Sequence, residues 1–230
     1  MSKFFPLLSL LIAFAAQAEI STDWNQVKVE DGVEVYEGNV VGSNVVAFKG
    51  VALIDAPLSH VLSVLYDLEQ IKRWMSNLKD YRTVEWINKF KKIDYNRLES
   101  PWPLSDRDFV YNVTIHVDPR KSVDIIFENT THPMFPKVTD VVRGDVRFGR
   151  YLVEQDPASG KVRLTVEMFA DPKGQVPKWM VNMVQRSWPV RTISRIRDIA
   201  TDKDFKPLPE ISVYLDGEKS QRVPTAIGSK

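Results

Sequence analysis

The segment PWPLSDRDFV, residues 101–110, decides the fold, because it places charged side chains where a proline turn becomes a strand. The two prolines that flank Trp102 fix φ and withhold backbone donors, so Trp102 is expected in an extended turn. From Phe109 onward, apolar and polar residues alternate as in a half-buried strand. An arginine that enters a sheet at this point, Arg107, needs a partner or a ligand.

Upstream of this segment, the alternation of residues predicts strands and one main helix. Residues 24–41 form a hairpin around the turn pair Asp31 and Gly32, and residues 45–53 form another strand. Pro57 then opens a run to Leu68 with apolar residues at helical spacing, followed by a short second helix or turn. Residues 84–98 suggest a further strand pair.

Downstream, the pattern predicts more antiparallel strands and then a helix. Residues 111–117 pair with 123–127, and 141–153 with 162–169, with a loop at 129–140 between the two pairs. Residues 175–200 carry an apolar helical stripe that Pro189 should kink. This order predicts a single α+β domain, in which a curved antiparallel sheet wraps a long C-terminal helix.

Two motifs resemble one known family. The segment at 101–110 is similar to the PRDFV-type segment of StAR-related lipid-transfer (START) domains, and DPKGQVPKWMVN at 171–182 looks like the turn into that family's last helix. The resemblance covers roughly residues 24–200 of the chain. It implies a helix-grip fold with an internal tunnel that binds one lipid molecule, which many members carry between membranes.

The resemblance also implies an acid and an arginine that meet a lipid head inside the tunnel. The arginine corresponds to Arg107. The acid falls on Asp80, by matching residues 74–80, which begin with Trp74 and Met75, to the WNPNVKE-like run of steroid-carrying members. The alternative for Arg107 is a structural ion pair with a neighbouring aspartate, Asp106 or Asp108.

Other candidate site residues are apolar, and each has a structural alternative. Trp102 is either a tunnel wall or a core plug. Trp179, Met180 and Met183 either face the tunnel from the last helix or form an ordinary core stripe. The resemblance places the loop with Met134 and Phe135 at the tunnel mouth, where an exposed apolar pair can contact a membrane or guard the entrance. The alternative is a loop folded back on the core.

The first 18 residues read as a signal peptide, with Lys3, an apolar run and small residues at the predicted cleavage point between Ala18 and Glu19. An uncleaved anchor is the alternative, but the run is shorter than the roughly 20 residues that span a bilayer. We therefore expect a START-like domain at 19–200, a polar tail at 201–230, and a periplasmic or secreted protein.

Composition excludes several function classes. Removing Lys3 from the 31 basic residues leaves 30 against 30 acidic residues, which argues against a nucleic-acid partner. The chain has no cysteine and only three scattered histidines, so a metal site is not expected. Nucleophile-elbow and phosphate-loop motifs are missing, so we expect no catalytic residue and no cofactor. The 43% hydrophobic content suffices for a core and a cavity without disulfides, and we expect a monomer.

The sequence therefore favours a protein that binds a sterol-like molecule, hopanoid, phospholipid or fatty acid, and that transfers or senses it with transient membrane contact. One alternative is an enzyme that uses Asp80, Asp106 or Asp108 as an acid or base, which a raised carboxyl pKa in the cavity would favour. The other is a scaffold that binds a protein through the 134–136 loop or the tail, for which a filled core would be the decisive observation.

Overall fold

The computed structural model describes residues 20–40, 43, 45–75, 77–100, 102–118, 122–211 and 215, so the predicted signal peptide lies outside the described residues. Within them, ten strands form one sheet. Nine follow the order β1-β2-β3-β10-β9-β7-β6-β5-β4 with antiparallel neighbours, and β8 pairs in parallel with β6. The strands are β1 (Ile20–Glu30), β2 (Val33–Val40), β3 (Ala47–Ile54), β4 (Leu78–Asn88), β5 (Lys91–Leu98), β6 (Asp106–Asp118), β7 (Ser122–Asn129), β8 (Val141–Arg143), β9 (Asp145–Gln155) and β10 (Val162–Asp171).

The predicted strands and their antiparallel pairs are confirmed, except that the strand predicted at 141–153 is two strands, β8 and β9, of which β8 pairs in parallel with β6. Asp31 and Gly32 both have positive φ, 51° and 69°, in the tight turn between β1 and β2. Asn and Asp tolerate this backbone conformation better than most residues, and glycine adopts it freely, which explains the choice of residues at the turn. The α+β prediction with a curved antiparallel sheet is thus correct.

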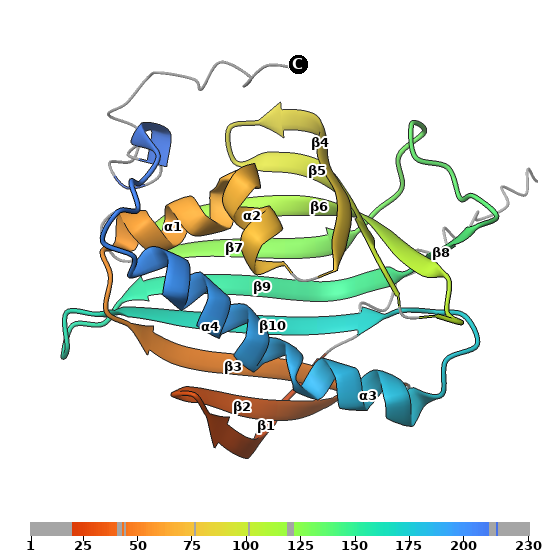
Figure 1. Ribbon diagram of the computed structural model, residues 1–230, viewed down its shortest axis with the longest axis horizontal. Coiled ribbons are helices and arrows are strands. Elements are labelled where there is room, and N and C mark those ends of the chain that lie inside the picture. Colours follow the sequence, from red (N-terminus) through yellow and green to blue (C-terminus); the bar gives the residue numbers. More distant parts are fainter. Residues whose placement is uncertain are drawn as a thin grey trace, which may run out of the picture.

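The helices cover one face of the sheet, as Figure 1 shows. They are α1 (Leu58–Tyr66), α2 (Leu68–Trp74), α3 (Lys178–Arg186) and α4 (Trp188–Ala200), followed by the short η1 (Pro209–Ile211). The Asp67 carboxylate accepts the Glu69 backbone N–H at 3.0 Å and caps α2. Helix α4 approaches β3 at Gly50, where an added Cβ would lie 2.6 Å from the Pro189 Cβ.

The C-terminal helical region differs from the prediction of one helix kinked at Pro189. It is two helices, α3 and α4, separated at Ser187. Pro189 lies in the first turn of α4, where its missing N–H would have no helical partner in any case. The proline therefore starts the second helix instead of bending a continuous one.

The chain beyond α4 also differs from the predicted tail. Phe205 stacks edge-on to His60 at a ring-centroid distance of 5.3 Å, and Ile211 is almost fully buried. The Leu208 backbone N–H donates to the buried Ser63 hydroxyl at 2.9 Å. The packed domain therefore extends past residue 200, at least to Ile211.

Candidate functional site

A cavity of about 390 Å³ lies between the helix-covered face of the sheet and the helices α2, α3 and α4. Its volume falls within the roughly 300–1,000 Å³ that is typical of small-ligand sites. Most of its lining is apolar, with a large aromatic share contributed by Trp74, Phe109, Tyr111, Phe127, Tyr151 and Trp188. The structure thus contains an internal space, and the filled core expected of a scaffold is not observed.

The aromatic side chains contact one another across several elements. Tyr151 on β9 lies 5.0 Å from Phe127 and 6.1 Å from Trp74 between ring centroids, both in edge-to-face geometry. The Trp74 indole N–H donates to the Val64 carbonyl at 2.9 Å, so its polar atom is satisfied. This aromatic wall can shelter a hydrocarbon chain or ring system, because contact with apolar rings replaces water.

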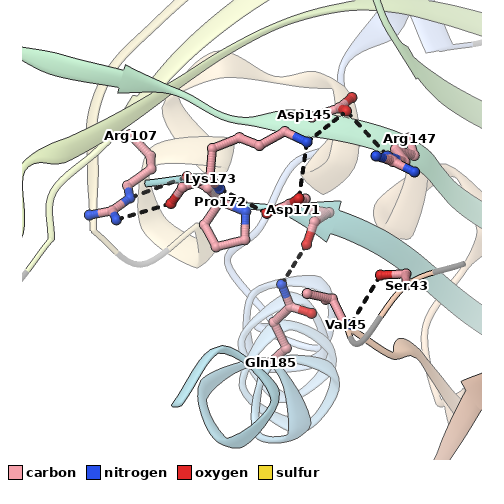
Figure 2. A network of polar contacts seen from close by, with 10 residues as sticks. Ser43, Val45, Arg107, Asp145, Arg147, Asp171, Pro172, Lys173 and Gln185 are labelled. Carbon is pink, nitrogen blue, oxygen red and sulfur yellow. Dashed lines mark hydrogen bonds and ion pairs between the residues drawn. The ribbon is translucent and has the colours of Figure 1, made fainter. Parts of the chain in front are cut away.

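Arg107 extends from the start of β6 on the cavity face. Successive side chains of a strand alternate between its faces, so Arg107, Phe109 and Tyr111 share one face, and all three line the cavity. Arg107 is 7% exposed. Figure 2 shows its guanidinium directed at the main chain of the turn after β10, where it donates to the carbonyls of Pro172 at 3.4 Å and Lys173 at 3.5 Å.

Local sequence fixes the turn that presents these carbonyls. Lys173 and Gly174 both have positive φ, 53° and 74°. The Asp171 carboxylate accepts the Lys173 backbone N–H at 2.9 Å, and the Lys173 ammonium pairs with Asp171 at 3.0 Å and with Asp145 at 3.5 Å. The 171–174 turn therefore connects Arg107 to the start of α3.

The alternative reading of Arg107 as a partner of a neighbouring aspartate does not hold. Asp106 pairs with Arg97 at 2.6 Å. Asp108 binds Arg143 through two hydrogen bonds of 2.7 and 2.9 Å on the opposite face of β6. In the described part of the chain, the guanidinium of Arg107 donates only to the neutral oxygens of Ser100, Ser105, Pro172 and Lys173.

Burial lowers the pKa of Arg107, and the nearby Asp106 opposes this shift. Arginine still remains charged at any physiological pH, because its ordinary pKa lies far above neutrality. The cavity therefore contains a buried cation without a direct anionic partner among the described residues. Such a cation can bind a phosphate or carboxylate group strongly, since neutral hydrogen bonds do not offset its charge.

Trp74, Met75 and Met180 line the cavity together with Arg107, but four other candidates lie elsewhere. Asp80 forms an ion pair with the exposed Arg82 at 2.8 Å and does not reach the cavity lining. Trp102 is 93% exposed, so it is neither a tunnel wall nor a core plug. Trp179 and Met183, 64% and 59% exposed, point away from the cavity.

The loop with Met134 and Phe135 also departs from its expected position. The Phe135 ring stacks on Tyr95 at 4.2 Å, and its carbonyl accepts a hydrogen bond from Arg143. Tyr95 is on the face of β5 opposite to the cavity-lining Asn96, so Phe135 folds back on the outer face of the sheet. Met134 is exposed, and neither residue lines the cavity.

A polar cluster that the sequence pattern did not predict lies at the inner part of the cavity. Asn96 and Tyr111 lie on the lining, and the Asn96 amide donates to the Tyr111 hydroxyl at 3.1 Å. Tyr81, also on the lining, donates to Asp94 at 2.5 Å, and Asp94 pairs with Lys92 at 2.8 Å. The available signal was the polar Asp94 and Asn96 two residues apart in a strand.

Burial raises the pKa of Tyr81 and of Tyr111 well above the ordinary value, and the charge of Asp94 raises both further. Both hydroxyls therefore stay protonated at physiological pH. Among the described residues, no group of three or more acidic or histidine side chains is placed to hold a metal ion. Nor does any described helix have the length and apolar character needed to cross a bilayer.

A comparison with protein-family models matches the START domain to residues 14–198. The chain belongs to the START domain family. Phosphatidylcholine transfer protein of the rat is 25% identical over 169 residues, which cover 72% of this chain and 78% of that protein. These findings confirm the resemblance of the segments at 101–110 and 171–182 to START domains.

Solved structures agree with the fold. Human STARD10 superposes with a TM-score of 0.70 at 24% identity and covers 77% of this chain and 72% of its own. A STAR-related lipid transfer protein fragment from Xanthomonas axonopodis gives 0.67 at 25% identity, covering 78% of this chain and 99% of its own. The helix-grip architecture is therefore shown, and two relatives of this START protein, from the rat and from Xanthomonas axonopodis, are named as lipid-transfer proteins.

Proposed function

We propose that this START protein binds one lipid molecule in its cavity and transfers or senses that lipid in the cell envelope. The observation that carries the proposal is the combination of a largely apolar cavity with the buried, anion-free Arg107. The apolar lining replaces water around the lipid's hydrocarbon, worth about 0.8 kcal/mol for each buried methylene. Arg107 then meets the polar head.

The charge of Arg107 favours a phosphate or carboxylate head, as in a phospholipid or a fatty acid, over an uncharged one. The rat relative is named for a phospholipid, which agrees with this preference. A sterol-like or hopanoid ligand would rely more on the aromatic wall.

Membrane contact is proposed through exposed apolar side chains on segments that also line the cavity. Val184 lines the cavity and is 52% exposed, and Trp179 and Met183 are exposed on the same helix, α3. Trp102 is exposed two residues before the lining residue Leu104. Amphipathic tryptophan side chains suit the membrane–water interface. These four residues replace Met134 and Phe135 as the proposed contact.

Native mass spectrometry tests the lipid-binding proposal directly. The chain from Glu19 onward is produced in a bacterial host, so that bacterial lipids are available to it, and is purified without detergent. Its mass is measured before and after lipid extraction. A mass increase equal to one lipid, removed by extraction, is expected. A ligand-free mass that persists after incubation with phospholipid vesicles would contradict the proposal.

A further inference from the structure

We propose that the inner polar cluster is a hydroxyl-binding subsite, so that the preferred ligand carries a hydroxyl group on its buried, otherwise apolar part. This inference rests on the proposed lipid-binding function and narrows the ligand class. The subsite consists of Asn96 on β5 and Tyr111 on β6, both less than 10% exposed and both on the cavity lining.

The amide of Asn96 is half satisfied. Its nitrogen donates to the Tyr111 hydroxyl at 3.1 Å and lies 4.0 Å from the Met75 sulfur. Its oxygen is buried and has no hydrogen-bond partner among the described residues. A buried polar atom without a partner costs free energy, so its place beside a cavity indicates that a bound group supplies the missing donor.

Tyr111 offers the complementary group. Its hydroxyl oxygen accepts from Asn96, and within the described chain its own proton reaches no acceptor. The raised pKa of Tyr111 keeps this proton in place. The pair therefore holds one unpaired acceptor and one unpaired donor at the cavity wall, and because the Asn96 oxygen has almost no accessible surface, a small rotation of the amide brings it to the ligand.

A single ligand hydroxyl matches this pair, because it can donate to the Asn96 oxygen and accept from Tyr111. A carbonyl would satisfy only Tyr111. A carboxylate has no proton to donate and would also face the charge of the nearby Asp94, whose pair with Lys92 occupies only one of its two oxygens. The subsite thus selects against a second anionic group at this depth.

Arg107 and Tyr111 are four residues apart on β6, which places their Cα atoms about 13 Å apart at 3.3 Å per residue. Two ligand types have a suitable form. One is a fatty acid with its carboxylate at Arg107 and a hydroxyl near the far end of a medium-length chain. The other is a ring alcohol of the sterol or hopanoid type that enters hydroxyl first.

Competition between matched ligands tests the subsite. Phosphatidylethanolamine–phosphatidylglycerol vesicles are doped with equal amounts of lauric acid and ω-hydroxylauric acid or, in a second arm, of cholestane and cholestanol. The ratio of the two bound ligands is measured by mass spectrometry after transfer to the protein. In at least one arm, we expect about ten times more of the hydroxylated ligand than of its parent compound to be bound. A tenfold ratio is the effect of about one hydrogen bond in a site that excludes water. The arm that shows the preference identifies the ligand type.

Two variants show whether the preference depends on the subsite. Asn96→Leu keeps the volume but removes the amide, and Tyr111→Phe removes only the hydroxyl. Each should bring the ratio close to one while uptake of the parent compounds continues. The second variant decides the matter if the first does not fold.

The outcomes separate this inference from the proposed function. Equal binding of both members of each pair by the wild type would overturn the hydroxyl subsite and would indicate that water satisfies Asn96. A preference that persists in both variants would overturn it as well. Failure of the wild type to take up any lipid, including those of the vesicles, would overturn the proposed function and the subsite together.

Discussion

At the scale of single residues, Arg107 has unusual surroundings for a buried cation. Its guanidinium donates to Ser105, Ser100, Pro172 and Lys173 oxygens, all of which are neutral. Buried charges in proteins are normally paired, because removing a charge from water is costly. An anionic ligand would pair with this charge and offset its desolvation cost. Part of the free energy of binding would therefore come from removing this cost in the ligand-free protein.

Replacing Arg107 with methionine should therefore weaken the binding of anionic lipids more than it weakens folding. A hydrogen bond to a charged group contributes about 1.5–3 kcal/mol, so we expect a 10- to 100-fold rise in Kd for a fatty acid. The matched control is Arg82→Met at an exposed site. Fluorescence displacement measures both, and a folded Arg107→Met protein with unchanged affinity would disprove the ligand role.

Asp108 and Arg143 have a different task, because their side chains are buried on the outer face of the sheet and form two hydrogen bonds with each other. Asp108→Ala leaves the charge of Arg143 uncompensated, which should cost about 3–5 kcal/mol of unfolding free energy. Denaturant titration measures this loss. Asp80→Ala, at the partly exposed pair with Arg82, should cost far less, and an equal loss for both variants would contradict the argument.

The resemblance to START domains placed Arg107 in the tunnel, whereas the residues alone indicated only that a charge entering a strand needs a partner or a ligand. The prediction for Trp102 was wrong, since a large aromatic residue normally packs inside, whereas this turn projects it outward. The same resemblance placed Asp80 in the tunnel by matching a motif, but the side chain pairs with Arg82 instead. The direction in which a side chain leaves a turn depends on tertiary packing, and the residue type alone does not specify that packing.

At the scale of elements, β5 shows why the inner cluster was missed. In β5, the apolar Ile93 and Tyr95 alternate with the polar Asp94 and Asn96, which normally indicates a polar face in water. In the structure both faces are covered: Phe135 covers the apolar face, and the cavity lies on the polar one. The hairpins between neighbouring strands needed only local alternation and turns, so those predictions succeeded.

Helix α3 presents Trp179 and Met183 to solvent, one helical turn apart. If this face enters the headgroup region, the double variant Trp179→Ser with Met183→Ser should slow lipid transfer between vesicles severalfold while equilibrium binding stays unchanged. A transfer assay with a fluorescent phospholipid measures the rate. Met134→Ser, at another exposed methionine, is the control, and equal slowing by both changes would argue against a specific role for α3.

At the scale of the whole molecule, we propose that residues 1–18 are a signal peptide, which would determine where the mature chain begins. Residues 1–18 should be removed during export, so that the protein recovered from the envelope starts at Glu19. Intact-mass measurement of protein expressed from the full sequence checks this. A recovered chain that retains Lys3 and partitions with membranes would support the uncleaved anchor.

Ligand binding should stabilise the entire fold, because the cavity wall is formed by strands and helices from both ends of the chain. At a free lipid concentration of 100 times Kd, linkage gives about 2.7 kcal/mol. For a domain of this size, that corresponds to a rise in Tm of roughly 5–10 °C. Scanning calorimetry of delipidated and loaded protein measures the shift, and an unchanged Tm under demonstrated saturation would show that the lipid binds the unfolded chain as well as the folded one.

The turn at 171–174 has a consequence for how cargo is released. If a lipid head binds Arg107 as we propose, it competes with the carbonyls of this turn for the same donors. A lipid head that takes over the hydrogen bonds of the Arg107 guanidinium would release the 171–174 turn, which leads into α3. Because coupling between two binding events is reciprocal, membrane binding by α3 would then change the affinity for the lipid by the same factor by which the lipid changes the affinity for the membrane. Contact with the target membrane would thus change the affinity for the bound lipid, and Arg107 would couple the two events.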